Sequence, residues 1–170
     1  PSVKTVIDVG AQFSRAIRLD NNGRIANFIL NEKCAGGSGK FLQTIARILH
    51  MNVGEIGDLS LTATNPVEFT TACAVFAESE AVSRIAEGAA PADILAGLNR
   101  AMASKIITLV TRVSYAPDCA VTGGGAKNKG LVKAIQEELS AHVFVADEPQ
   151  ITAAFGAALI ALERLNPNAH

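Results

Sequence analysis

The chain has no excess of either charge. Of its 170 residues only 18% are charged, and the formal net charge is −1. Surfaces that bind nucleic acid or an anionic membrane need a surplus of lysine and arginine, which this composition lacks. Hydrophobic residues make up 49% of the chain, enough for the core of one domain. We therefore expect a single globular domain that binds neither nucleic acid nor a membrane.

Long apolar runs and a leader sequence are also missing. No uninterrupted apolar stretch reaches the roughly 18 residues that a membrane-spanning helix needs. The first residues, Pro1 to Lys4, lead straight into an apolar strand instead of a secretion signal. Because no Met precedes Pro1, we interpret the chain as processed or, preferably, as part of a longer protein.

Cysteine is scarce, with Cys34, Cys73 and Cys119 as the only three. An odd number without a secretion signal argues against a disulfide framework and for the reducing cytoplasm. There a cysteine either fills the core or does chemistry. Cys119 precedes an apolar strand and is interpreted as a core residue, whereas Cys34 and Cys73 each stand near the start of a predicted helix, where a thiolate is favoured.

The pattern of apolar residues predicts an α/β fold with a mixed sheet. Runs at 4–9, 14–20 and 24–30 predict a three-strand antiparallel meander, with a hairpin turn at Asn21-Asn22-Gly23. A helical insert spans 34–113 and is followed by alternating strands and helices. Within and after the insert we expect helices near 41–49, 73–88, 90–113, 129–139 and 152–165, and strands at 119–122 and 143–145. The small residues of the last helix are expected to pack closely.

Two glycine sites follow predicted strands. At the first hairpin, Asp8 and Gly10 are placed so that backbone amides can approach a phosphate and the carboxylate can hold a hydrated Mg²⁺. The second site, 122–128, has three glycines between a strand and a helix whose N-terminus favours anions. Either site alone is most often only a tight turn. Together, in this order, they indicate a nucleotide site.

Four stretches closely resemble the family of 2-hydroxyacyl-CoA dehydratase activators and benzoyl-CoA reductase ATPases. They are NEKCAGGSGKFL at 31–42, CAVFAESE at 73–80, TGGGAKNKG at 122–130 and PQITAAFGAAL at 149–159. The resemblance covers essentially the whole chain. It implies an actin/sugar-kinase-like (ribonuclease H-like) fold, in which two similar lobes close over ATP. Residues 1–170 match the second, C-terminal lobe, and the first lobe is absent.

The resemblance also implies which residues form the sites. Asp8 is the implied catalytic residue, acting with ATP/ADP and Mg²⁺. Cys34 and Cys73 would give two thiolates to a [4Fe–4S] cluster shared across a dimer, and since such a cluster needs four, a partner chain must supply the others. The implied nucleotide-binding residues are Gly10, Ala11, Gln12, Gly123, Gly124, Gly125, Asn128, Pro149 and Gln150.

The implied function is an ATP-dependent activator. It would take electrons from ferredoxin or flavodoxin and pass them, at low potential, to a 2-hydroxyacyl-CoA dehydratase or a benzoyl-CoA reductase. Its dimer would be a homodimer or a pair of related ATPase subunits, and this lobe alone would not be fully active. Phe13 stands where the family often has an acidic residue. Two alternatives therefore stay open: a sugar or acyl kinase-like lobe, and a degenerate nucleotide-binding interaction domain without a cluster.

Overall fold

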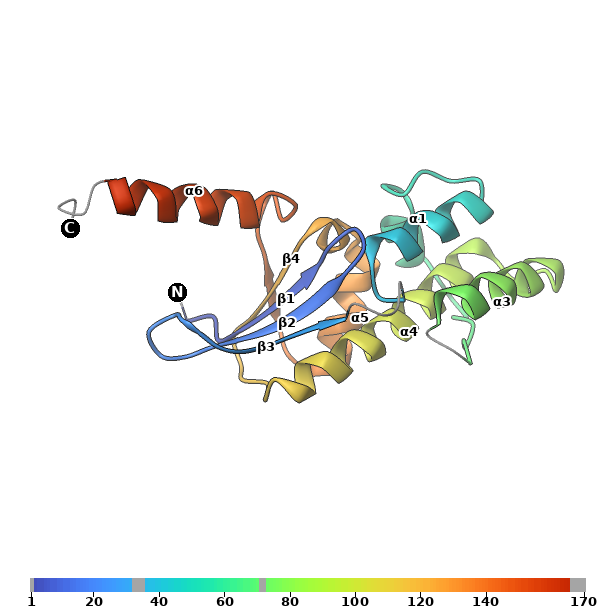
Figure 1. Ribbon diagram of the computed structural model, residues 1–170. Helices are drawn as coiled ribbons and strands as arrows, with labels where there is room; N and C mark the ends of the chain where they lie inside the picture. Colours follow the sequence, from blue (N-terminus) through green and yellow to red (C-terminus); the bar gives the residue numbers. More distant parts are fainter. Residues whose placement is uncertain (1, 32–35, 71–72, 166–170) are drawn as a thin grey trace.

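Five strands form one mixed sheet, with part of the helical structure against one of its faces and part beyond the strand ends (Figure 1). The structure is a computed structural model and describes residues 2–31, 36–70 and 73–165. The strand order is β3-β2-β1-β4-β5, with β1–β2 and β2–β3 antiparallel and β1–β4 and β4–β5 parallel. The strands are β1 (Thr5–Val9), β2 (Ser14–Leu19), β3 (Ile25–Asn31), β4 (Cys119–Thr122) and β5 (Val143–Val145). The predicted meander and mixed sheet are confirmed.

The helices agree with the sequence pattern in number and order, apart from two short additions. They are α1 (Gly39–Ile48), α3 (Ala74–Ala86), α4 (Pro91–Arg112), α5 (Lys129–Leu139) and α6 (Thr152–Leu165). The additions are α2 (Ile56–Ser60) and the 3₁₀ helix η1 (Gly124–Lys127), which the sequence analysis did not predict. Neither is long enough to show a helical period, so apolar spacing gives no signal for them.

One face of the sheet is covered by α4 and α5. Along β1 the side chains alternate, so that Ile7 and Val9 are fully buried in the core. By length and composition α4 is apolar enough to cross a membrane, the one such helix among the described residues. Its buried positions, including Leu98, Met102 and Ile106, belong instead to the core that the sheet shares with α2 and α5.

The other face of the sheet has an apolar row that no described element covers. Strand pairing aligns its members side by side across all five strands: Phe28, Ile17, Val6, Ala120 and Phe144. The two outer members, Phe28 and Phe144, are 61% and 47% exposed. This row is the exposed sheet face referred to below.

Helix α6 stands away from the sheet and the other helices (Figure 1). It has no buried residue, although its composition is almost wholly apolar and Phe155 is 62% exposed. The expectation that its small residues pack closely is therefore wrong within this chain. Since a helix that is apolar all round is normally buried, α6 is a surface that needs a partner.

Candidate functional site

The acidic residue of the first glycine site lies where two strands end side by side. Because β1 and β4 are parallel, Asp8 pairs in register with Thr122, whose hydroxyl donates to Asp8 Oδ1 over 3.3 Å. Arg15 Nε lies 3.4 Å from Asp8 Oδ2. The turn that follows is closed by Gly10 N donating to Phe13 O over 2.9 Å. These contacts hold the Asp8 carboxylate in place near the C-terminal end of β1, the central strand, where it stays partly exposed.

The three glycines of the second site have two different roles. Gly123 has φ +83°, and a Cβ there would overlap the carbonyl of Val9, while a Cβ at Gly125 would overlap the Val9 side chain. Both residues therefore let the loop after β4 pass close over the end of β1. At Gly124 a Cβ would meet only Gln150, at 3.9 Å. Gly124 is the glycine that leaves open space above the loop.

The two glycine sites enclose one cavity of about 610 Å³. Most of the predicted nucleotide residues line it: Asp8, Gly10, Ala11, Gly123, Gly124, Gly125, Asn128 and Gln150. Two predicted residues do not line it. Gln12 is exposed on the hairpin, and Pro149 is buried, where its carbonyl accepts from Gly123 N over 2.8 Å. We call this space the glycine cavity.

Several lining residues come from segments that the sequence analysis did not associate with the site. They are Gly39, Leu42, Gln43, Val53 and Gly54, while Lys127, within the second glycine site, lines the cavity as well. Helix α1 reaches the cavity because its first residues dock on the hairpin. Gly39 N donates to Gly10 O over 2.9 Å, and Lys40 N donates to Ala11 O over 2.7 Å. In the sequence, Gly39 is the residue that could have indicated this docking. A Cβ there would lie only 3.3 Å from the hairpin backbone.

A further contact ties the hairpin to the segment just before α1. The hydroxyl of Ser14, which is buried at the start of β2, donates to the carbonyl of Gly37. Together with the two main-chain bonds to α1, this contact joins the hairpin to residues 37–40. Cys34 itself lies outside the described residues.

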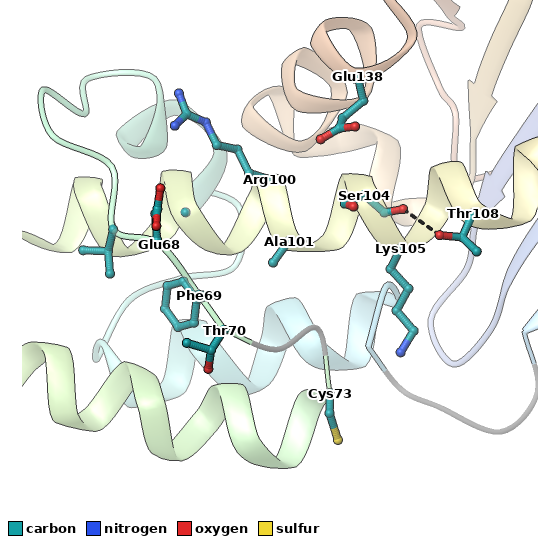
Figure 2. Close-up of a pocket in the computed structure, with 12 residues that line it drawn as sticks. Glu68, Phe69, Thr70, Cys73, Arg100, Ala101, Ser104, Lys105, Thr108 and Glu138 are labelled. Carbon is teal, nitrogen blue, oxygen red and sulfur yellow. Dashed lines mark hydrogen bonds between the residues drawn. The ribbon is translucent and has the colours of Figure 1, made fainter.

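Cys73 is the N-cap residue of α3, with an extended backbone (φ −77°, ψ 122°). It is half-buried and lines a second cavity of about 740 Å³, which we call the Cys73 cavity. Figure 2 shows α4 along one side of this cavity, with Lys105 extending from α4 toward the side where Cys73 lies. Cys73 thus lines a different cavity from Asp8, and residues of α4 line the Cys73 cavity.

The backbone leading to Cys73 is held by Glu80, to which the sequence analysis assigned no chemistry. Thr70 N donates to the Glu80 carboxylate over 3.2 Å, and the Thr70 hydroxyl donates to Glu80 Oε2 over 3.1 Å. Arg84, one turn further along α3, lies 3.6 Å from Glu80 Oε1. Glu80 therefore anchors the chain three residues before Cys73 to the helix that Cys73 begins.

Cys119 is a core residue, as predicted. It is fully buried in β4, and desolvation raises the pKa of its thiol to about 12. Within the described part of the chain, no three His, Cys, Asp or Glu side chains come together as a metal-binding group.

The fold is that of the actin and sugar-kinase class of ATPases, as the sequence predicted. The sequence matches the BadF/BadG/BcrA/BcrD ATPase family over residues 1–161, and the chain belongs to that family. It is 41% identical over 163 residues to the 2-hydroxyisocaproyl-CoA dehydratase activator of Clostridioides difficile, covering 96% of this chain and 61% of that protein. The solved structure of that activator with bound ADPNP has a TM-score of 0.94 over the same shares of the two chains.

Two further relatives have related names. The (R)-2-hydroxyglutaryl-CoA dehydratase activating ATPase of Acidaminococcus fermentans is 40% identical over 164 residues, which are 96% of this chain and 63% of that protein. The activator of lactoyl-CoA dehydratase of Anaerotignum propionicum is 42% identical over 163 residues, which are 96% of this chain and 63% of that protein. The chain thus spans less than two thirds of the length of these curated relatives.

Proposed function

We propose that this chain is the nucleotide-binding, cluster-bearing lobe of an ATP-dependent activator. The activator would pass low-potential electrons to a 2-hydroxyacyl-CoA dehydratase or a benzoyl-CoA reductase. One observation carries the proposal. The hairpin that lines the glycine cavity is hydrogen-bonded directly to the start of α1 and to Gly37, close in sequence to Cys34.

In this proposal the glycine cavity binds ATP and ADP. The backbone at Gly10, Ala11 and Gly124 borders the open space and would approach the phosphates. Asp8, held between a hydroxyl and a guanidinium, would orient a hydrated Mg²⁺. Lys127 lines the same cavity and adds a positive charge, although it also pairs with Glu148 at 3.2 Å.

Phe13 does not argue for a degenerate site. It replaces an acidic residue of the family pattern, but it does not line the glycine cavity and its side chain is 39% exposed. Its carbonyl closes the hairpin turn, a role that any residue can fill. The carboxylate that the proposal needs is that of Asp8.

Cys34 and Cys73 are the proposed ligands of a [4Fe–4S] cluster shared with a partner chain. Cys73 fits this role because it is half-buried beside a cavity at the N-terminus of α3, where helix amides and the positive end of the helix dipole favour an anionic cluster. Such a cluster supplies one-electron transfer at low potential. The electron donor would be ferredoxin or flavodoxin, and the partner chain a second copy or a related ATPase subunit.

We also propose that this lobe works with a second lobe. The exposed sheet face and α6 are two apolar surfaces that no described element covers. The family relatives are longer than the stretch that matches this chain. A second lobe that covered both surfaces would also complete the ATP site, with 34–113 as the insert that carries the cysteines.

The test measures nucleotide binding and iron on the same preparation. After anaerobic reconstitution we expect Mg·ADP binding and about two irons and two sulfides per chain in a dimer. Cys73→Ser should lose the iron and keep the Mg·ADP affinity, because Cys73 lies outside the glycine cavity. Cys119→Ala is the matched control and should keep both, since Cys119 is buried in β4.

Other outcomes separate the alternatives. Nucleotide binding without iron, in this chain and in a longer form of the protein, would favour a kinase-like lobe with structural cysteines. Loss of iron in Cys119→Ala but not in Cys73→Ser would contradict the ligand assignment. Absence of both iron and nucleotide binding would favour the interaction domain.

A further inference from the structure

A chain of buried polar side chains connects three helices beneath the glycine cavity. Asn128 Nδ2 donates to Asn99 Oδ1 over 3.3 Å, and Asn99 Nδ2 donates to Ser60 Oγ over 3.0 Å. The Ser60 hydroxyl donates to Gly57 O over 2.7 Å. At the other end, Asn128 Oδ1 accepts from Leu131 N over 2.9 Å and so caps α5. The three polar side chains are 3–6% exposed, which makes this relay part of the core.

Hydrogen-bond donation can run along the relay in only one direction. Its ends are backbone groups of fixed polarity, the N–H of Leu131 and the carbonyl of Gly57. An asparagine that accepts at Oδ1 from a backbone amide must present Nδ2 on its other side, and the next asparagine must then present Oδ1. The backbone therefore fixes the orientation of both amides and of the hydroxyl, and no member can turn without breaking its neighbour's bond.

Two glycines show how closely the helices approach at the relay. A Cβ at Gly57 would lie 2.9 Å from Asn128 Oδ1, and a Cβ at Gly130 would overlap Ser60 Oγ. The helices thus pack closely at these two contacts, and Ser60, Asn99 and Gly130 also line a small cavity of about 80 Å³. Removing Asn99 would leave Asn128 Nδ2 without its acceptor in the core and would remove the bond that Ser60 Oγ accepts, which is more costly than the loss of a solvent-exposed bond.

We propose that Asn99 is a positioning residue for the nucleotide, acting through Asn128. Asn128 lines the glycine cavity, but both polar atoms of its side chain are engaged in the relay and the α5 cap. Through these two bonds its side chain shapes the loop that follows Gly124 and Gly125. Asn99, on α4, holds Asn128 in that position. This inference rests on the proposed nucleotide-binding function of the cavity.

The experiment compares two changes at Asn99 with a neighbouring core change. Asn99→Leu keeps the number and branching of the side-chain heavy atoms and removes the relay. Asn99→Asp keeps an acceptor for Asn128 Nδ2 and for a rotated Ser60 hydroxyl. Leu98→Ala is the control, because Leu98 is a core residue on the same turn of α4 that takes no part in the relay. The readouts are the affinity for Mg·ADP and the hydrogen exchange rate of the Leu131 amide without nucleotide.

We expect Asn99→Leu to weaken Mg·ADP binding about tenfold and to speed exchange at Leu131 by a similar factor. Asn99→Asp should recover part of both, because it restores the acceptor for Asn128 Nδ2 but not the donor to Ser60 Oγ and buries a carboxylate. Leu98→Ala should lower the unfolding temperature and leave the Mg·ADP affinity of the folded protein within about twofold of the original.

Two results would overturn the inference, and a third bears on the proposed function. The first is an unchanged affinity and exchange rate in folded Asn99→Leu. The second is an equal loss of affinity in Leu98→Ala, which would make Asn99 merely structural. The third arises if the unmodified protein fails to bind Mg·ADP. That failure counts against the proposed function, and the exchange rate of Leu131 then decides the relay by itself: a faster rate in Asn99→Leu supports it, and an unchanged rate overturns it.

Discussion

The glycine cavity and the Cys73 cavity are built in different ways. Main-chain atoms form much of the first, at the ends of β1 and β4, where parallel pairing puts Asp8 beside Thr122. The second is bounded by side chains of α4 and by an extended segment at 67–70. Sheet hydrogen bonds therefore fix the first cavity, whereas side-chain tethers fix the second. A cavity formed by main-chain atoms is indicated in the sequence by its glycines, whereas a cavity formed by side chains leaves little sign in the sequence.

The tethers of the Cys73 cavity come from single acidic residues. Asp93 Oδ1, in the first turn of α4, accepts from Thr64 N over 2.9 Å and from Asn65 N over 2.8 Å. Further along, Gly97 lets the backbone of Val67 lie directly on α4, because a Cβ there would overlap the Val67 carbonyl. With Glu80 at the other end, the segment is held at both sides of the cavity. The shape of this cavity thus depends on contacts between residues far apart in the chain.

The largest effect is expected from leucine at two adjacent glycines of the first cavity. Gly125→Leu should lower the free energy of unfolding by about 3 kcal/mol, because the new side chain overlaps Val9. Gly124→Leu should leave the fold intact and abolish Mg·ADP binding, because its side chain enters the open space. Thermal unfolding and calorimetric titration check the two. Gly156→Ala, in α6 with open space around it, is the control and should lower neither the stability nor the Mg·ADP affinity. Equal destabilisation by the two substitutions would contradict the different roles assigned to Gly124 and Gly125.

A smaller effect concerns the cysteine buried at the start of β4. Burial raises the pKa of the Cys119 thiol from 9.0 to about 12. The neutral thiol is therefore favoured in the folded chain, and its contribution is complete below pH 9 and lost as the pH rises toward 12. Between pH 7 and pH 10.5 the protein should lose about 2 kcal/mol more stability than Cys119→Ala does. Urea unfolding under reducing conditions at both pH values measures the difference, and parallel losses in the two proteins would contradict it.

The smallest effect tests the contact between the hairpin and the segment before α1. Ser14→Ala removes the bond to Gly37 O and leaves that carbonyl buried. Amide exchange at Gly39 and Lys40 should become about fivefold faster, and Mg·ADP should protect these amides less than in the unmodified protein. Ser83→Ala, which removes a 3.1 Å bond to Ser79 O on the exposed side of α3, is the control. Unaltered protection in Ser14→Ala would show that the hairpin and α1 are joined by the main-chain bonds alone.

Much of the fold could be predicted from local signals. The runs at 129–139, 143–145 and 152–165 gave the bounds of α5, β5 and α6 as the structure has them. Alternation and turn chemistry gave the meander to within about one residue at each strand end. The five-residue α2 and the 3₁₀ turn after Gly123 escaped prediction because neither carries a periodic apolar pattern. The close packing expected for α6 was wrong because composition does not say which surface a helix meets.

The candidate site divides in the same way. Glycines and an aspartate after strands were readable as a nucleotide site because backbone freedom at a strand end is a property of the residues themselves. The roles of Gly39, Glu80 and Asn99 were not readable, since each depends on what another part of the chain brings to it.

By itself, the sequence determined the order of strands and helices, the hairpin with Asp8 and Gly10, and the family to which the chain belongs. Only the tertiary structure decided that α1 docks on that hairpin, that Cys73 and Asp8 lie in separate cavities, and that a buried amide relay supports the loop at Asn128. The physical reason is the distance along the chain over which each effect acts. Propensity and periodicity act between residues a few positions apart, whereas a cavity or a relay exists only when distant segments share a hydrogen bond or exclude water together.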